Sequence, residues 1–174
     1  MQRDADVEIR PEQPSDFDAI DRVVGDAFLA EFGSNSEVAL VRTMRARGEL
    51  VADLTLVALR DEVVVGHLAM SEVTLDGRAA GGLGLAPVAV APALQGRGVG
   101  SALIEAALAR AEAAGWRFVV LLGHEHYYPR FGFEPASPRG LTGDYGDHDG
   151  WMVRALGDFD VPSGHVRYGS AFRD

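Results

Sequence analysis

The sequence predicts an α/β fold whose mixed sheet is built around one crossover connection. An apolar segment, 83–91, leads through a glycine-rich turn, 95–100, into an amphipathic helix, 101–114. A second apolar run, 118–122, follows that helix, and this order is typical of two parallel strands joined by a helix. Residues 54–75 have the pattern of an antiparallel hairpin, so both strand orientations are expected in the sheet.

The N-terminal part is expected to contain one short strand and two helices. Residues 7–10 alternate as a strand, and residues 11–16 form a turn into a helix for which Ser15 is the expected N-cap. Apolar residues then recur at helical spacing until Gly33 ends the helix. Residues 37–47 repeat this spacing and predict the second helix.

The central helix has the clearest pattern. Glu105, Arg110 and Glu112 lie opposite its apolar face, and Gly115 supplies a C-terminal stop. Its apolar face consists of Leu103, Ile104, Ala107, Leu108 and Ala111. The continuous apolar run that follows is typical of a strand buried on both faces.

The flanking strands are read from shorter patterns. Residues 54–59 and 63–75 flank the turn residues 61–62, which completes the hairpin. Beyond Phe133 the chain is acidic and rich in loops, with one more strand expected at 151–156.

Composition excludes several kinds of chemistry. The 174 residues predict one domain spanning 1–174, with residues 1–6 and the last few residues expected to be flexible. Cysteine is absent, which removes disulfides, thiolate nucleophiles and sulfur-ligated metal sites. All 16 basic residues are arginine, so neither a Schiff-base lysine nor the lysine of a Walker phosphate loop exists here.

Charge and hydropathy predict a cytoplasmic protein. The formal net charge of −10 disfavours nucleic acid and anionic membranes as partners. Residues 1–14 have no apolar core, so no signal peptide is expected. The uncharged stretch 79–96 is marginal in length for a membrane span and is interrupted by glycine and proline.

The glycine turn, Gln95-Gly96-Arg97-Gly98-Val99-Gly100, precedes a helix N-terminus. Backbone N–H groups and the helix dipole there suit a phosphate or pyrophosphate, although a tight turn that binds nothing has the same pattern. The missing lysine excludes a Walker loop. A dinucleotide fingerprint would place glycine at Ser101 and an acidic residue near Leu122, which weakens that alternative.

Two blocks of the sequence resemble the GNAT superfamily of N-acetyltransferases. Residues 88–100 resemble its acyl-CoA-binding strand and turn, with the Gln/Arg-x-x-Gly-x-Gly/Ala pattern complete. Residues 127–133, Tyr-Tyr-Pro-Arg-Phe-Gly-Phe, are similar to its Tyr-x-x-x-Gly-Phe signature in the YhbS-like bacterial branch. Together with the helix between them, the blocks cover 83–133. The resemblance implies a mixed, mostly antiparallel sheet with a splayed central parallel strand pair and about four flanking helices.

The resemblance also implies acetyl-CoA as cosubstrate. Backbone groups of the strand would bond the pantetheine arm, and backbone N–H groups from Gly96 to Ser101 would hold the pyrophosphate. Gln95 and Arg97 would add side-chain contacts. The implied cofactor-binding residues are Val88, Ala89, Val90, Gln95, Gly96, Arg97, Gly98, Val99, Gly100 and Ser101.

The resemblance assigns Tyr128 as the general acid. An unperturbed phenol has a pKa of about 10, so it can protonate the departing CoA thiolate at neutral pH. Tyr127 is assigned to packing or to the substrate wall. The general base is expected at Glu72, because the inner face of that hairpin often lines the acceptor site in relatives. Glu31, Glu125 and His126 remain as alternatives.

No metal site is predicted. His124 and His126 could ligate zinc but lack a third ligand, and loop histidines are the more ordinary reading. The remaining histidines, His67, His148 and His165, are interpreted as isolated.

These observations predict an acetyl-CoA-dependent N-acetyltransferase that moves an acetyl group to a primary amine of a small molecule or peptide. Without cysteine, direct transfer in a ternary complex is the economical mechanism. The alternatives are a non-catalytic acyl-CoA-binding or regulatory module and, less favoured, a nucleotide-binding redox domain. A homodimer is common in the family, although no residue here points to one.

Overall fold

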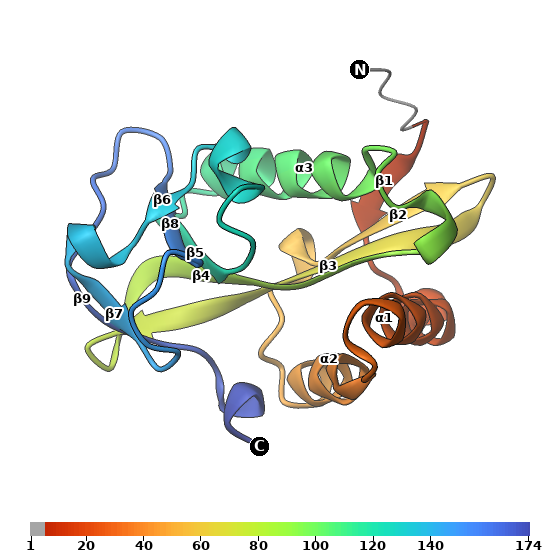
Figure 1. Ribbon diagram of the computed structural model, residues 1–174, viewed down its shortest axis with the longest axis horizontal. Helices are drawn as coiled ribbons and strands as arrows, with labels where there is room; N and C mark the ends of the chain where they lie inside the picture. The colour runs from red at the N-terminus through yellow and green to blue at the C-terminus, as the bar shows by residue number, and fades with distance from the viewer. Residues whose placement is uncertain (1–5) are drawn as a thin grey trace. The chain divides into compact units, whose positions relative to one another are not determined.

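The structure is a computed structural model that describes residues 6–174 (Figure 1). These residues group into two compact units. The first contains the described residues through Ala69 together with Pro87–Ala107, and the second contains Met70–Ala86 and Leu108–Asp174. The predicted flexibility of residues 1–5 lies outside the described part of the chain.

The first unit is built on antiparallel strands. Strand β1 (Glu8–Pro11) pairs with β2 (Leu56–Arg60), and β2 pairs with the first part of β3 (Val63–Leu75). The turn between β2 and β3 consists of Asp61 and Glu62, with φ angles of 49° and 66°. Two successive positive φ angles match the twist of a tight hairpin, so the predicted hairpin is confirmed.

Helices cover both faces of the strands in the first unit. Helix α1 (Phe17–Phe32) packs its buried residues, among them Ile20 and Val24, against Val57 of β2. Helix α2 (Ser36–Ala46) follows α1 on the same face (Figure 1). On the opposite face, a Cβ added to Gly66 would lie 2.9 Å from Leu103, so the first turns of α3 (Val99–Ala113) pack closely there.

The second unit contains the parallel pair. The first part of β4 (Arg78–Val90) runs parallel to β5 (Phe118–Leu122). Their pairing extends from Gly82 opposite Phe118 to Gly84 opposite Val120, whereas both strands continue beyond it. The two strands therefore separate after three paired positions, which confirms the expected splay.

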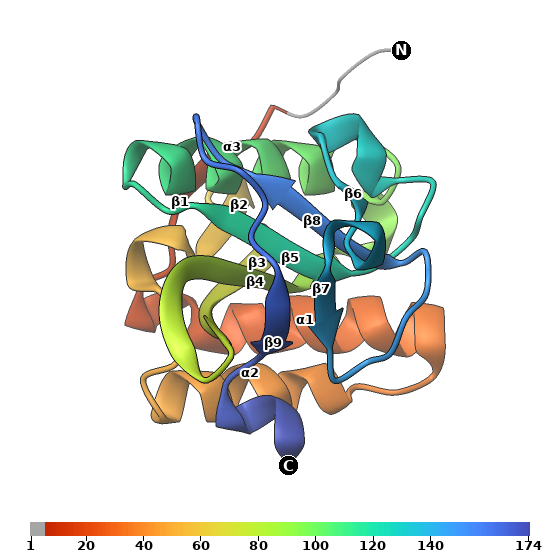
Figure 2. The ribbon, with the colours of Figure 1, turned by 90° about the vertical axis from the view of Figure 1, so that its left-hand side faces the viewer.

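Further strands complete the second unit. Strand β5 pairs antiparallel with β8 (Trp151–Ala155), and β8 pairs with β6 (Glu134–Pro135). Strand β9 (Gly164–Arg167) pairs antiparallel with the end of β3 and parallel with β7 (Leu141–Gly143), which lies beside it in Figure 2.

Glycines make room for aromatic rings in the second unit. A Cβ added to Gly82 would lie 2.3 Å from the Phe118 ring, and one added to Gly84 would lie 2.3 Å from the Tyr168 ring. Phe118 and Tyr168 belong to one buried cluster that also contains Trp151. The Trp151 indole N–H donates to the Leu141 carbonyl at 3.1 Å, so this large side chain is buried with its polar atom bonded.

Several expectations require correction. Residues 6–174 contain three α-helices rather than about four. Ser15 does not cap α1, because residues 14–16 form a 3-10 turn and the carboxylate of Asp16 instead accepts the Gln13 N–H at 2.8 Å. Where one late strand was expected, β6 to β9 are present, because these short strands are held by backbone pairing rather than by an alternating apolar pattern. None of the helices in residues 6–174 is both long and apolar enough to cross a membrane.

The substitution Gly84→Ala is expected to destabilise the protein by about 1–3 kcal/mol, because its methyl group would overlap the buried Tyr168 ring. Gly25→Ala is the control. Its Cβ would lie 3.4 Å from Val38 within α1, and removing a helical glycine should stabilise by ~0.5–1 kcal/mol. Urea unfolding of both variants measures the difference, and equal midpoints would contradict the close packing at Gly84.

Candidate active site

The glycine turn of the first unit connects β4 to α3. A short 3-10 helix, Pro92–Leu94, leads into it, and α3 begins at Val99. Gly96 and Gly98 have φ angles of 76° and 91°, a region that residues with a Cβ rarely adopt. The first hydrogen bond of the helix runs from the Ala102 N–H to the Gly98 carbonyl at 3.0 Å. The N–H groups at the very start of an α-helix have no acceptor within the helix and are suited to an anion.

Two side chains of the turn behave differently. The Gln95 amide nitrogen donates to the Val90 carbonyl at 3.2 Å, so it ties the turn back to the end of β4. The Arg97 side chain is exposed. Gln95 therefore ties the turn to β4, although both Gln95 and Arg97 are exposed.

At the end of β4, in the first unit, buried and half-buried side chains alternate. Ala89 is buried in the cluster that includes α1, whereas Val88 and Val90 are half-buried. The Ala91 N–H donates to the Val65 carbonyl of β3 at 2.9 Å. The first unit thus holds all ten predicted cofactor-binding residues, Val88 to Val90 and Gln95 to Ser101.

Tyr128 belongs to the second unit and is half-buried at the start of a 3-10 helix, Tyr128–Phe131. Its ring meets Tyr127 and Phe133 edge-on, with centroids 5.1 and 5.9 Å apart. A Cβ added to Gly123 would lie 2.4 Å from Cε2 of Tyr128. Gly123 therefore leaves the space that the ring fills, a role that the sequence alone did not reveal.

The candidate bases have exposed side chains. Glu72 is exposed on β3, and Glu31 is exposed near the end of α1. Glu125 is exposed and lies 3.2 Å from His126. Residues 6–174 bring together no group of three histidine, aspartate or glutamate side chains that could hold a metal ion.

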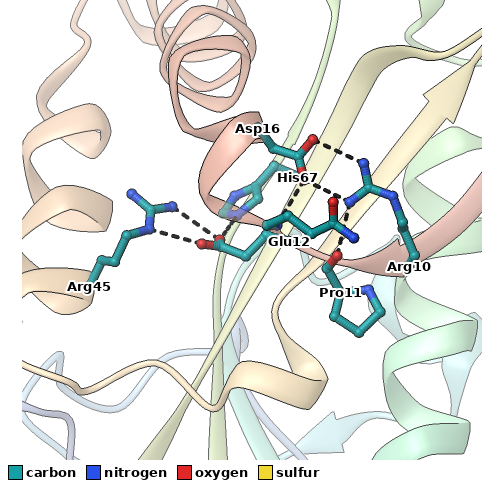
Figure 3. Close-up of polar contacts among 7 residues, drawn as sticks. Arg10, Pro11, Glu12, Asp16, Arg45 and His67 are labelled. Carbon is teal, nitrogen blue, oxygen red and sulfur yellow. Dashed lines mark hydrogen bonds and ion pairs between the residues drawn. The ribbon is translucent and has the colours of Figure 1, made fainter.

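A partly buried ionic cluster in the first unit was not anticipated from the sequence. It consists of Arg10, Glu12, Asp16, Arg45 and His67 (Figure 3). The Glu12 carboxylate lies between Arg45, which contacts it through two nitrogens at 2.8 and 3.0 Å, and Nε2 of His67 at 2.8 Å (Figure 3). Arg10 contacts both carboxylate oxygens of Asp16, at 2.7 and 3.0 Å.

The cluster holds both of its carboxyl groups in the ionised form. The hydrogen bond from Arg10 lowers the pKa of Asp16 from its ordinary value of 3.8, and the Gln13 N–H adds to this effect. Burial alone would raise the pKa of Glu12, but hydrogen bonds from His67 and Arg45 lower it below its ordinary value of 4.5. Each carboxylate is therefore stabilised by partners that exist only in the folded chain.

The interpretation of His67 and His165 as isolated is wrong, because each bonds a carboxylate. His67 is fully buried and bonded to Glu12, and its Nδ1 has no hydrogen-bond partner among residues 6–174. His165 bonds Thr142 at 2.8 Å and Asp144 at 2.9 Å. In the sequence, His67 is marked only as a polar residue inside the apolar segment 63–70. Its partner Glu12 could not be predicted, because it lies 55 residues away in the sequence.

Comparison with known proteins identifies the family. A family model described as an acetyltransferase (GNAT) domain matches residues 8–136. The chain belongs to the GNAT family of acetyltransferases. It is 35% identical to the uncharacterized N-acetyltransferase YjhQ of Escherichia coli strain K12 over 78% of this chain and 80% of that protein. It is also 35% identical to the uncharacterized N-acetyltransferase YhbS of the same strain, over 86% and 87% respectively.

Solved GNAT structures are similar over nearly the whole chain. A GNAT acetyltransferase from Brucella melitensis in complex with acetyl-CoA is 38% identical with a TM-score of 0.82, covering 97% of this chain and 99% of that one. YhbS from Escherichia coli in complex with CoA is 31% identical with a TM-score of 0.88, covering 100% and 96%. The predicted resemblance to the YhbS-like branch and the enzyme class of N-acetyltransferase are confirmed. Both neighbours hold the cosubstrate, or its CoA product, that the sequence predicts.

Asp16→Asn in this GNAT protein is expected to lower stability by about 1–3 kcal/mol at pH 7, because it removes the charge that Arg10 contacts. The folded-state pKa of Asp16 is depressed, so its contribution is complete above the ordinary value of 3.8 and disappears as the pH falls through the lower folded value. Urea unfolding at pH 7 and at lower pH measures whether the free energies of unfolding of the wild type and Asp16→Asn become equal as the pH falls. Asp18→Asn, at an exposed position, is the control and should change stability by less than ~0.5 kcal/mol.

Proposed function

We propose that this GNAT protein transfers the acetyl group of acetyl-CoA to a primary amine of a small molecule or peptide, by direct transfer in a ternary complex. The observation that carries the proposal is the glycine turn, where Gly96 and Gly98 have positive φ angles directly before α3. Backbone amides at a helix N-terminus bind phosphate groups. The two neighbours crystallised with acetyl-CoA and CoA support this assignment.

The turn would hold the pyrophosphate through backbone N–H groups from Gly96 to Ser101. Glycine at 96 and 98 supports this role in two ways, by permitting the positive φ angles and by removing side chains that would obstruct the approach of phosphate. Arg97, with its exposed side chain, adds a positive charge at the rim. Gln95 holds the turn against Val90.

The pantetheine arm would lie along Val88, Ala89 and Val90. An extended ligand that pairs with a strand uses main-chain groups for affinity, as in strand addition to a sheet edge. The separation of β4 from β5 after Gly84 and Val120 supports this role, because it ends the pairing that would otherwise occupy backbone groups.

The reaction forms one bond and breaks one bond. The amine nitrogen attacks the thioester carbon, an N–C bond forms, and the C–S bond breaks. The nitrogen loses one proton and the departing thiolate gains one, so amine and thioester become amide and thiol. Tyr128 is the proposed proton donor to the thiolate, and a backbone amide near Val90 steadies the developing oxyanion. Packing of the Tyr128 ring against Gly123 and Phe133 supports a fixed orientation of the phenol.

Glu72 is the carboxylate that the sequence nominates as proton acceptor. Its side chain is exposed on β3, so it is accessible to an acceptor amine from solvent. A Glu72→Gln variant that keeps full turnover would remove it from the mechanism.

A non-catalytic acyl-CoA-binding module is the alternative. The apolar strand 118–122, which lacks the glutamate used by some relatives, is the observation that favours it. Release of CoA thiol across a panel of chemically diverse amines separates the two functions, because the module binds acetyl-CoA without turnover.

Gly98→Ala is expected to weaken acetyl-CoA binding by about tenfold or more, because alanine rarely adopts a φ of 91° and its methyl group would face the phosphate. Gly115→Ala is the matched control. It introduces similar strain at the other end of α3, where φ is 86° and the space is open. Calorimetric titration should show normal affinity in the control. Equal affinities for all three proteins would contradict phosphate binding at the turn.

Tyr128→Phe is expected to lower kcat by about 100-fold or more while the Kd for acetyl-CoA stays within about twofold, because only the proton donor is lost. Tyr145→Phe, in the same unit and with its ring edge-on to Tyr168, is the control and should retain activity. Steady-state thiol release and calorimetry provide the two measurements. An unchanged chemical step would eliminate the phenol as the acid.

A further inference from the structure

Thr142, His165 and Asp144 form a connected polar cluster within the second unit. Thr142 lies on β7 and is the register partner of His165 on the neighbouring parallel strand β9 (Figure 2). Asp144 follows β7 directly, two residues after Thr142, and a two-residue step along an extended chain returns a side chain to the same face. The pairing of two short strands therefore brings a hydroxyl, an imidazole and a carboxylate together.

The imidazole of His165 connects the other two side chains. Oγ1 of Thr142 lies 2.8 Å from Nδ1 of the ring, and Oδ1 of Asp144 lies 2.9 Å from Nε2. A carboxylate can only accept a hydrogen bond, so in the neutral ring Nε2 carries the hydrogen and Nδ1 has the lone pair. The Thr142 hydroxyl then donates to Nδ1, which is in place to take its proton.

The backbone of His165 is held from both sides by Asp76, in the turn between β3 and β4. The His165 N–H donates to Oδ1 of Asp76 at 2.9 Å, and the Asp76 N–H donates to the His165 carbonyl, also at 2.9 Å. Asp76 belongs to the same unit. These bonds fix the position on β9 from which the imidazole projects, so Asp76 is a positioning residue.

The cluster is open to solvent. Thr142 is exposed, and the side chains of His165 and Asp144 are each 42% exposed. A small acyl donor can therefore reach the hydroxyl directly. The transfer mechanism proposed above uses none of these three residues.

We propose that Thr142 is a nucleophilic hydroxyl that is O-acylated by acyl thioesters, with His165 as its base and Asp144 as the group that orients the ring. A hydroxyl is a weak nucleophile until a neighbouring base, itself oriented by a third group, accepts its proton at about 2.6–3.2 Å. Both contacts of the His165 ring lie in this range. Neither the glycine turn nor Tyr128 takes part, so the inference does not rest on the amine transfer proposed above.

The proposed step forms one bond and breaks one bond. Oγ1 of Thr142 attacks the thioester carbon, an O–C bond forms, and the C–S bond breaks. The hydroxyl proton passes to Nδ1 of His165 and from there to the departing thiolate. The products are a threonine ester and a free thiol, and Asp144 stabilises the imidazolium that exists between the two proton transfers.

The first test treats the whole wild-type chain with the thioester S-acetyl-N-acetylcysteamine in a buffer without amines. This donor has no phosphate, so it does not need the glycine turn. Peptide mass spectrometry after an acid quench locates acetyl groups, and hydroxylamine removes those held as esters. We expect Thr142 to be acetylated about tenfold or more faster than Ser34, an exposed and less hindered hydroxyl that contacts only hydroxyl and backbone groups of Ser36 among its printed bonds.

Release of N-acetylcysteamine provides a second readout that does not depend on accumulation of the ester. The chain contains no cysteine, so every thiol detected comes from the donor. Thiol release should depend on Thr142 and His165 even if water removes the acetyl group quickly. Equal acetylation of Thr142 and Ser34 with no thiol release dependent on His165 would overturn the proposal.

Variants separate chemistry from a purely structural clamp between β7 and β9. His165→Gln should lower the initial rate at Thr142, measured as acetylation and thiol release, by about tenfold or more. Asp144→Asn should also lower it, because an amide nitrogen can donate to Nε2 and leave the ring hydrogen on Nδ1. Thr142→Ser should keep the reaction at position 142. An unchanged rate in folded His165→Gln would contradict its role as base.

His126→Gln is the matched control, because His126 is an exposed histidine of the same unit that also lies beside a carboxylate, 3.2 Å from Glu125. It should leave the rate at Thr142 within about twofold of the wild type, whereas an equal loss in both histidine variants would remove the specific role of His165. Circular dichroism and a thermal melt establish that each variant is folded.

Discussion

The start of α3 imposes the constraint on which the proposed cosubstrate site depends. An α-helix leaves its first N–H groups without acceptors, and these groups must be bonded by something outside the helix. Here the preceding turn is glycine-rich, with positive φ angles at Gly96 and Gly98, and glycine places no side chain over the backbone. The Gln95 amide bonds the strand rather than the helix. The proposed pyrophosphate site depends on this combination of a glycine-rich turn and a helix N-terminus.

The ionic cluster provides the second organising feature of the first unit. Glu12 follows β1, Arg45 lies on α2 and His67 lies on β3, so one carboxylate joins three elements. Replacing such a buried group with an uncharged one leaves the partner charge unpaired, which is usually strongly destabilising. The ion pair between Arg45 and Glu12 therefore helps to hold α2 against the strands. The cluster bonds His67 through Nε2, whereas Nδ1 of the same ring has no hydrogen-bond partner among residues 6–174.

The sequence predicted those parts of the fold in which local pattern and tertiary environment agree. Strands 63–75 and 118–122 coincide with β3 and β5, and the predicted apolar face of α3 is buried. The short strands β7 and β9 could not be predicted, because they are held by pairing between segments more than 20 residues apart. Their side chains carry no alternating pattern that would reveal this pairing.

In the candidate site, too, the residues with a local sequence pattern could be predicted and those held by long-range contacts could not. The motif residues of the turn could be named because their spacing reflects a local requirement for glycine before a helix. The Glu12–His67 contact spans 55 residues, and neither residue has a local signal beyond being polar in its segment. The role of Gly123 was equally hidden, since only the folded chain shows that the Tyr128 ring occupies the space of its missing Cβ. The features that could not be predicted are therefore side-chain packing and polar contacts between residues far apart in the sequence.

The absence of cysteine and lysine narrows how protons can move during the reaction. Without either side chain, the chain cannot form an acyl-cysteine or an acyl-lysine intermediate, which favours attack by the amine on the thioester itself. In direct transfer the nitrogen becomes more acidic at the same time as the sulfur becomes more basic. One group cannot hold and release a proton for both atoms unless it shuttles between them, so a separate acid and base are the simpler arrangement. A phenol suits the sulfur because it is protonated at neutral pH.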